Sequence, residues 1–135
     1  MDLLDNSYRY DGVTLIELVI VLAILSLLLL ASLPSYNRYV QRTYRTEAIE
    51  ALLSEATRQE QNYLVKRKFE TRQAYSGASG RYRISVELID GGRGYVIRAQ
   101  PRGNQLEDIC GTFELDNKGR KRSDGESGLC WAGRG

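Results

Sequence analysis

The sequence contains no histidine and only two cysteines among its 135 residues. Common zinc sites and histidine-based catalytic triads are built from these residue types, so neither can be assembled here. We therefore predict no catalytic residue, no metal site and no cofactor, and we expect a protein that is not an enzyme.

Glycine and proline are scarce in the first half of the chain, which favours continuous helix. No glycine stands between Ser35 and Lys68, and apolar residues recur there at four-residue spacing, the pattern of an amphipathic helix. The apolar stripe consists of Tyr36, Val40, Tyr44, Ala48, Leu52 and Ala56, widened by Ile49, Leu53 and Tyr63. Because proline removes a backbone donor, we expect a kink at Pro34 and not a chain break.

Charge is almost absent from one long stretch. Residues 13–33 are nearly all apolar, and Glu17 is the one acid among them. As a helix this stretch extends ~31 Å, enough to cross the hydrocarbon of a bilayer. A charge costs roughly 2.5–3.5 kcal/mol at the centre of a membrane helix and less near its end, so Glu17 is expected to have a function. Together with the amphipathic stripe, the stretch predicts one helix of about 50 residues.

The segment from Gly12 to Glu17, with the sequence GVTLIE, resembles the prepilin signature of type IV pilins and pseudopilins. In that family a short leader ends in glycine, and glutamate is the fifth residue after it, as Glu17 is when counted from Val13. Pro34 and the following Ser35, Tyr36 and Tyr39 also match. The leader here has three aspartates and one arginine where family leaders are usually basic, and Val13 stands where phenylalanine is usual.

The resemblance implies three regions and a processing step. Residues 1–12 are a leader that prepilin peptidase removes after Gly12, and Val13 is then N-methylated. Residues 13–34 are the transmembrane half of the helix, which becomes the filament core and in which Thr14, Glu17 and Pro34 serve assembly. Residues 35–135 form a periplasmic globular domain. A secretory signal that ends near Ser32 and a plain single-span anchor are the alternatives.

Cleavage leaves an ammonium group on Val13 that the Glu17 carboxylate can neutralise. The resemblance implies that the partner is the N-terminus of a neighbouring subunit. Because an unpaired charge in apolar surroundings is costly, such a pair enforces register more than it adds stability. The alternative is an acid tolerated near a helix end.

The strand pattern begins after a connector at residues 71–80. Alternating apolar residues predict antiparallel strands at 82–88, 95–99, 109–116 and, more weakly, 120–122, with turns at 90–94 and 117–119. Ile109, Phe113 and Leu115 are the apolar candidates of the third strand. The predicted fold class is α+β and type IV pilin-like, with a long N-terminal helix packed on a small antiparallel sheet of three to four strands.

Cys110 and Cys130 are predicted to form a disulfide, because the apolar stretch directs the domain across a membrane and oxidising compartments preserve such bonds. Two reduced thiols are the alternative. The acids and glycines between them suggest the calcium sites of some pseudopilins, but their spacing fits no standard loop. With Gly111, Thr112 and Trp131, the cysteines resemble those of a minor pilin of the PilE type.

Basic residues are concentrated after residue 34, where 18 basic and 13 acidic side chains leave a net charge of +5. This excess permits an anionic partner. The triplets Lys66, Arg67, Lys68 and Arg120, Lys121, Arg122 are interpreted as solvated charge, with a DNA-binding face as the alternative. The aromatic and basic residues from Tyr36 to Arg45 are interpreted as a membrane-interface belt and filament contact, with nucleic-acid stacking as the alternative.

Arginines close to the apolar stretch argue against the orientation that the family implies. Arg38, Arg42 and Arg45 follow it, and the positive-inside rule places such residues in the cytoplasm. We follow the family, because long domains translocate largely regardless of charge.

The resulting hypothesis is a minor pilin, a structural subunit of a type IV pilus that serves adhesion and twitching motility. It is inserted in the inner membrane with a periplasmic C-terminal domain, and it reaches the cell surface in the assembled pilus. Its expected partners are other pilin subunits, prepilin peptidase and the inner-membrane assembly machinery. A type II secretion pseudopilin and a DNA-uptake receptor pilin are the alternatives.

Overall fold

A computed structural model describes residues 12–133, except for the side chains of residues 31–35. The chain divides into two compact units, Met1–Tyr36 and Asn37–Gly135. The long helix α1 (Leu15–Lys66) contributes residues to both and has 52 residues, which confirms the prediction of one helix of about 50 residues. Its helical backbone continues through Pro34. Of the predicted leader, residues 1–11 lie outside the described residues.

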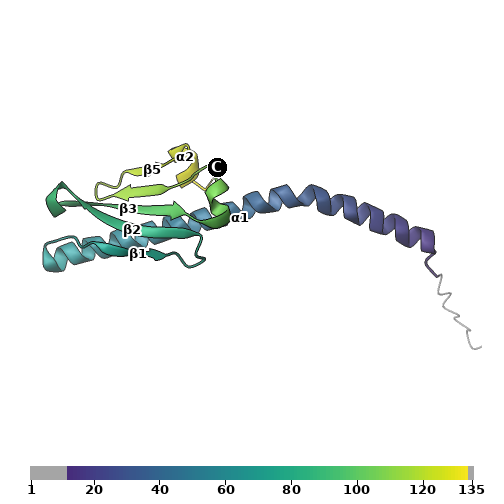
Figure 1. Ribbon diagram of the computed structural model, residues 1–135, viewed down its shortest axis with the longest axis horizontal. Coiled ribbons are helices and arrows are strands. Elements are labelled where there is room, and N and C mark those ends of the chain that lie inside the picture. Colours follow the sequence, from purple (N-terminus) through teal and green to yellow (C-terminus); the bar gives the residue numbers. More distant parts are fainter. Residues whose placement is uncertain (1–11, 134–135) are drawn as a thin grey trace, which may run out of the picture. The chain divides into compact units, whose positions relative to one another are not determined.

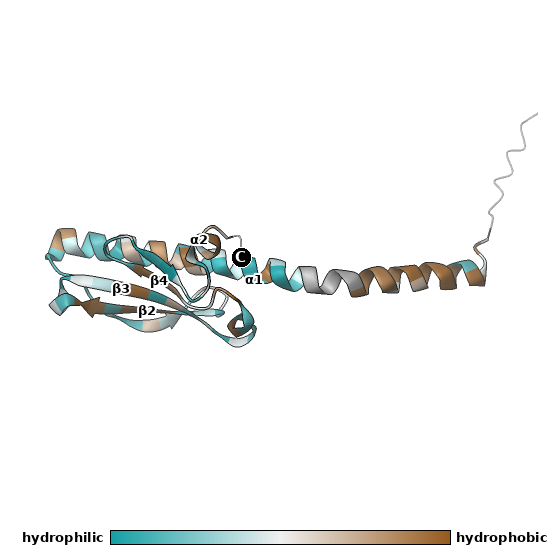
Figure 2. Cartoon of the chain, turned by 90° about the horizontal axis from the view of Figure 1, so that it is seen from above, coloured by the Kyte–Doolittle hydropathy of each residue, from teal (hydrophilic) through white to brown (hydrophobic). Residues whose placement is uncertain are grey.

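The first unit contains the apolar part of α1, which Figure 2 shows in brown. Its large side chains are exposed on every side of the helix, from 49 % for Val21 to 81 % for Leu15. Over the residues that the structure describes, no helix reaches the combination of length and hydropathy required of a membrane span. The transmembrane assignment of residues 13–34 therefore stays a prediction.

The second unit is a five-stranded antiparallel sheet packed on the C-terminal part of α1 (Figure 1). The strands follow one another in chain order across the sheet: β1 (Arg72–Ser76), β2 (Tyr82–Ile89), β3 (Gly94–Pro101), β4 (Phe113–Asp116) and β5 (Lys121–Ser123). The 3-10 turns η1 (Asp90–Gly92) and η2 (Gly103–Glu107) and the short helix α2 (Ser127–Trp131) complete it. The α+β, pilin-like fold class is confirmed.

Two strand predictions are corrected. The predicted connector at 71–80 contains β1, an edge strand whose polar Arg72 and Gln73 hide the alternation and whose pairing with β2 is irregular between Arg72 and Tyr75. The sheet therefore has five strands and not three to four. The third predicted strand begins only at Phe113, and Ile109 is 71 % exposed instead of belonging to the core. The turn at Asp108 and the disulfide at Cys110 hold that segment as a loop.

The core lies between the inner face of the sheet and α1. Tyr82, Ile84, Ile97 and Phe113 are fully buried there, against Ala48 and Leu52 of α1. This confirms the central part of the predicted stripe but not its edges, since Tyr36 and Leu53 are exposed. The inner side of α1 also buries three polar residues that the pattern did not indicate, namely Arg45, Glu55 and Gln59.

Left-handed residues end α1 and form the β2–β3 turn. Arg67 has φ +58°, and its N–H donates to the carbonyl of Tyr63, 2.9 Å away, which closes the last turn of the helix. Asp90, Gly91 and Gly92 all have positive φ, a conformation that glycine adopts freely and aspartate tolerates. Both features lie at the same end of the domain.

Candidate nucleic-acid interface

Three connections meet at one end of the second unit, which we call the basic end and define by residues 66–70, 90–93 and 117–120. Phe69 stacks on Tyr63 and packs against Tyr95 in a T-shaped arrangement with 4.9 Å between ring centroids, which places the α1–β1 connection beside the start of β3. The β4–β5 turn reaches the same place, because the N–H of Asn117 donates to the carbonyl of Tyr95 at 3.1 Å. Figure 1 shows these connections at the left end of the sheet.

Hydrogen bonds from α1 fix the first of these connections. The amide of Gln59, fully buried, donates to the carbonyl of Glu70 at 2.7 Å and accepts from the Glu70 N–H at 3.0 Å. The buried Glu55 carboxylate accepts hydrogen bonds from Arg58, Gln59 and Arg72, which ties β1 to the helix. Burial alone would raise the pKa of Glu55, but the hydrogen bonds from Arg58 and Arg72 outweigh it and hold that pKa below its usual value.

Four cations at the basic end form no salt bridge, with a 4 Å limit between nitrogen and oxygen, within residues 12–133. These are Arg67, Lys68, Arg93 and Lys118, all of them exposed. Two further cations there are paired, Lys66 with Glu70 at 2.9 Å and Arg120 with Asp116 at 2.5 Å. Unpaired, solvated cations grouped at one end can contact several phosphates of one nucleic acid.

The structure keeps one of the two basic triplets together and divides the other. Lys66, Arg67 and Lys68 lie together at the basic end. The other triplet is divided by the pleat of β5, because Lys121 lies on the inner side, with its ammonium 5.3 Å from the ring centroid of Trp131. Arg122, which pairs with Glu114, lies on the outer side, and Arg120 precedes the strand. The triplets belong to opposite edges of the sheet, so they do not form one continuous face.

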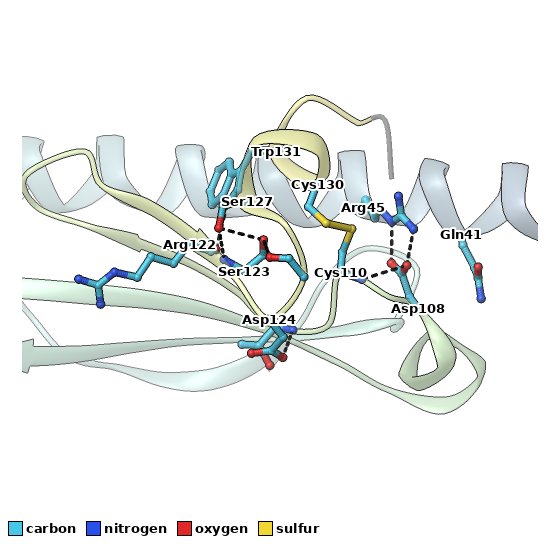
Figure 3. Close-up of a disulfide and its surroundings, with 12 residues drawn as sticks. Gln41, Arg45, Asp108, Cys110, Arg122, Ser123, Asp124, Ser127, Cys130 and Trp131 are labelled. Carbon is cyan, nitrogen blue, oxygen red and sulfur yellow. Dashed lines mark hydrogen bonds and ion pairs between the residues drawn. A yellow bond between two sulfur atoms is a disulfide. The ribbon is translucent and has the colours of Figure 1, made fainter.

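The aromatic and basic run before residue 46 is also divided. Tyr36 and Tyr39 are exposed, as an interface belt requires, whereas Arg45 is buried and Tyr44 packs on the core. Arg45 and Tyr44 therefore do not belong to such a belt. Arg45 binds Asp108 with two hydrogen bonds, one of them 2.7 Å from Nε to Oδ2 (Figure 3).

A buried polar network surrounds Asp108. The Gln105 amide donates to Asp108 at 2.8 Å and to the Tyr82 hydroxyl at 3.1 Å, and that hydroxyl donates to Asp108 at 3.5 Å. Burial raises the pKa of Tyr82 to about 12, so the phenol stays neutral. Sequence reasoning missed this network, and the only signal was an acid two residues before the first cysteine.

The predicted disulfide between Cys110 and Cys130 is present in the structure, with 5.7 Å between the Cα atoms (Figure 3). It joins the segment after η2 to α2. In the loop that it closes, Asp124 accepts a hydrogen bond from the Thr112 N–H at 2.7 Å. No group of three or more potential metal ligands occurs in the part of the chain that the structure describes.

Thr14 caps α1 at its N-terminus. Its hydroxyl accepts from the N–H of Glu17 at 3.3 Å, and the spacing of the two residues is that of a capping box. Glu17 is exposed on the first turn. Gly12 and Val13 precede the helix without regular structure, and cleavage between them stays a prediction.

Comparisons with known proteins cover both units. The family described as prokaryotic N-terminal methylation motif matches residues 8–33. A solved structure of a type IV pilin from Shewanella oneidensis is similar, with 26 % identity over 60 % of this chain and 89 % of that one and a TM-score of 0.53. No curated protein matches.

The family described as type IV minor pilin ComP, DNA uptake sequence receptor, matches residues 34–114, more than half of the chain. The resemblance to type IV pilins, first seen in residues 12–39, is thereby confirmed. The chain belongs to this family and is a type IV minor pilin.

Proposed function

We propose that this minor pilin binds DNA through the basic end of its globular domain. The observation that carries the proposal is the group of four unpaired cations there, in a chain whose family is described as a DNA uptake sequence receptor. Among the anionic partners that the positive net charge permits, this proposal selects DNA, the alternative that the basic triplets raised.

The geometry supports phosphate contact more than base readout. Arg67 and Lys68 follow directly on the end of α1, while Arg93 and Lys118 are presented by two turns. Each exposed cation that neutralises a phosphate releases a counterion and contributes about −0.9 to the slope of log K against log salt concentration. Four contacts therefore predict a slope of about −3.6.

The N-terminal unit serves processing and assembly in this proposal. Prepilin peptidase cleaves after Gly12, Val13 is methylated, and residues 13–34 hold the subunit in the inner membrane with its globular domain in the periplasm. Assembly machinery then moves it into a pilus, where the exposed apolar side chains pack against other pilin subunits. The match of the methylation motif to residues 8–33 supports this pathway. Adhesion and twitching motility stay predictions.

The test measures DNA affinity of the full chain in detergent micelles by fluorescence anisotropy with a labelled duplex. The double variant Arg67→Ala/Lys68→Ala is expected to weaken binding at low salt and to reduce the salt slope by about 1.8. The matched control is Arg83→Ala/Arg102→Ala, which removes two exposed arginines that have no ion-pair partner among the described residues and lie away from the basic end.

Two results would overturn the proposal. One is the absence of any salt-sensitive binding by the wild-type chain. The other is an equal loss in both double variants, which would show that general charge, and not the basic end, binds the duplex.

A further inference from the structure

A cavity of the globular domain lies at the end opposite the basic end. It has a volume of about 310 Å³ and is lined on one side by Asn37, Gln41 and Tyr44 of α1, and on the other by Arg81, Asn104 and Glu107. All of these residues belong to the second unit. The volume is at the lower end of the range for ligand sites and suits a single six-membered ring with substituents.

The walls of this cavity are firmly held. The Gln105 amide, fully buried beneath it, donates to the backbone carbonyl of Gln41 at 3.2 Å and so joins η2 to α1. The backbone of Arg81 accepts from the N–H of Arg102 at 2.8 Å, and its guanidinium lies 5.4 Å from the ring centroid of Tyr44. The site is therefore preformed, and the free-energy cost of ordering it when a ligand binds is small.

Four residues that line this cavity have polar side chains without a hydrogen-bond partner among the described residues. They are the amides of Asn37, Gln41 and Asn104 and the carboxylate of Glu107. Each of these groups is planar and offers two adjacent hydrogen-bonding atoms, and an amide offers both donors and acceptors. Two neighbouring hydroxyl groups of a ligand, each of which donates and accepts hydrogen bonds, complement such a pair of adjacent atoms.

Charge and surface chemistry restrict the ligand further. Arg81 and Glu107 bring opposite charges, so the cavity is neutral overall and the carboxylate disfavours a phosphate. A nucleobase is recognised by stacking on an aromatic or guanidinium plane, and in this cavity the Arg81 guanidinium lies over one face of the Tyr44 ring and so occupies that face. Val40 is the one aliphatic side chain in the lining, which excludes a predominantly apolar ligand.

We propose that this cavity binds one uncharged sugar residue of a glycan. The amides donate hydrogen bonds to its hydroxyls and accept hydrogen bonds from them, the carboxylate accepts from a hydroxyl, and Val40 contacts its apolar ring face. The site is independent of the proposed DNA function, because its lining residues belong to the opposite end of the domain. It would give this subunit a second kind of surface ligand.

The test is a titration of the ¹⁵N-labelled full chain, observed by NMR, with methyl α-glucopyranoside, methyl β-galactopyranoside and N-acetylglucosamine. A phosphocholine detergent replaces maltosides or glucosides, whose headgroups would occupy the site. At least one sugar is expected to shift the side-chain amide signals of Asn37, Gln41 and Asn104 saturably, with a Kd of order 1 mM, as suits a single small ring.

Variants separate this site from the basic end. Asn104→Ala and Glu107→Gln are each expected to weaken sugar binding about five-fold, the effect of one lost hydrogen bond, and to leave the affinity for duplex DNA unchanged. Arg67→Ala/Lys68→Ala is expected to weaken the binding of duplex DNA and to leave sugar binding unchanged. Dispersed amide spectra of all three variants verify that they fold.

The proposal is overturned if none of the three sugars gives saturable shifts at these amides. Shifts that both cavity variants leave unchanged would also overturn it. Saturation of the same signals by deoxynucleoside monophosphates, without any by sugars, would assign the cavity to DNA instead.

Discussion

Arg45 and Asp108, 63 residues apart in the sequence, form a buried ion pair that joins α1 to the segment before the disulfide. The Asp108 side chain is fully buried and that of Arg45 is 4 % exposed. Asp108 also accepts from the N–H of Cys110 at 3.4 Å, so one carboxylate links the helix, η2 and the disulfide. Such a pair adds little net stability over an apolar contact, but removing one partner leaves the other charge buried and unpaired.

Replacing Asp108 is therefore expected to be among the most damaging single changes. Asp108→Ala should lower the free energy of unfolding by about 3–5 kcal/mol, because the Arg45 guanidinium stays buried without its partner. Urea denaturation of the full chain in micelles, followed by near-UV circular dichroism, measures it. The neighbouring exposed Glu107→Ala should change it by less than about 0.5 kcal/mol. Equal losses in the two variants would contradict the role given to the pair.

Acid is expected to loosen the attachment of β1 through Glu55. Since the pKa of Glu55 is lower in the folded state than the usual 4.5, the unfolded state binds the proton more tightly. The contribution of Glu55 is thus fully present above pH 4.5 and is lost as the pH falls through the depressed folded-state pKa.

The variant Glu55→Gln isolates this effect. It should be less stable than wild type at neutral pH and should lose less stability between neutral pH and pH 3. Thermal unfolding across that range measures both, with the exposed Glu50→Gln as the matched control. Parallel pH profiles for Glu55→Gln and wild type would argue against the hydrogen bonds from Arg58 and Arg72 as the cause.

Reduction of the disulfide is expected to destabilise the globular domain by about 3 kcal/mol, the chain-entropy value for a loop of this length. The two cysteines are 20 residues apart, and Cys110 is fully buried. Urea denaturation with and without dithiothreitol measures the loss. The double variant Cys110→Ser/Cys130→Ser should have the reduced stability and no response to the reductant. A response in this variant would point to another cause.

Glu17 is expected to act in assembly and not in processing. Glu17→Val should yield a chain that begins at Val13 by mass spectrometry but enters filaments poorly, since the neighbouring ammonium would lose its counter-charge. Immunoblots of sheared filaments measure incorporation, and Ile20→Val serves as a control within the same helix. Normal incorporation of Glu17→Val would remove the assembly role, and a native chain that still begins at Met1 would remove the processing step.

Local sequence patterns determined the long helix, the α+β class and the family. These patterns are short-range features, so they can be read from the spacing of residues along the chain. They are the apolar run of residues 13–33, the four-residue stripe after Ser35 and the GVTLIE signature. Cys110 and Cys130 were the only two cysteines, so their pairing required no knowledge of the fold.

Only the tertiary structure decided which polar residues are buried and which cations stand together. From the sequence Arg45 was interpreted as a surface arginine, but in the structure it is buried and bound to Asp108, 63 residues further along the chain. The basic end brings Lys68, Arg93 and Lys118 together from three connections, and the cavity joins α1 to η2. Burial and charge grouping depend on contacts between distant segments, and periodicity along one segment carries no information about its partner.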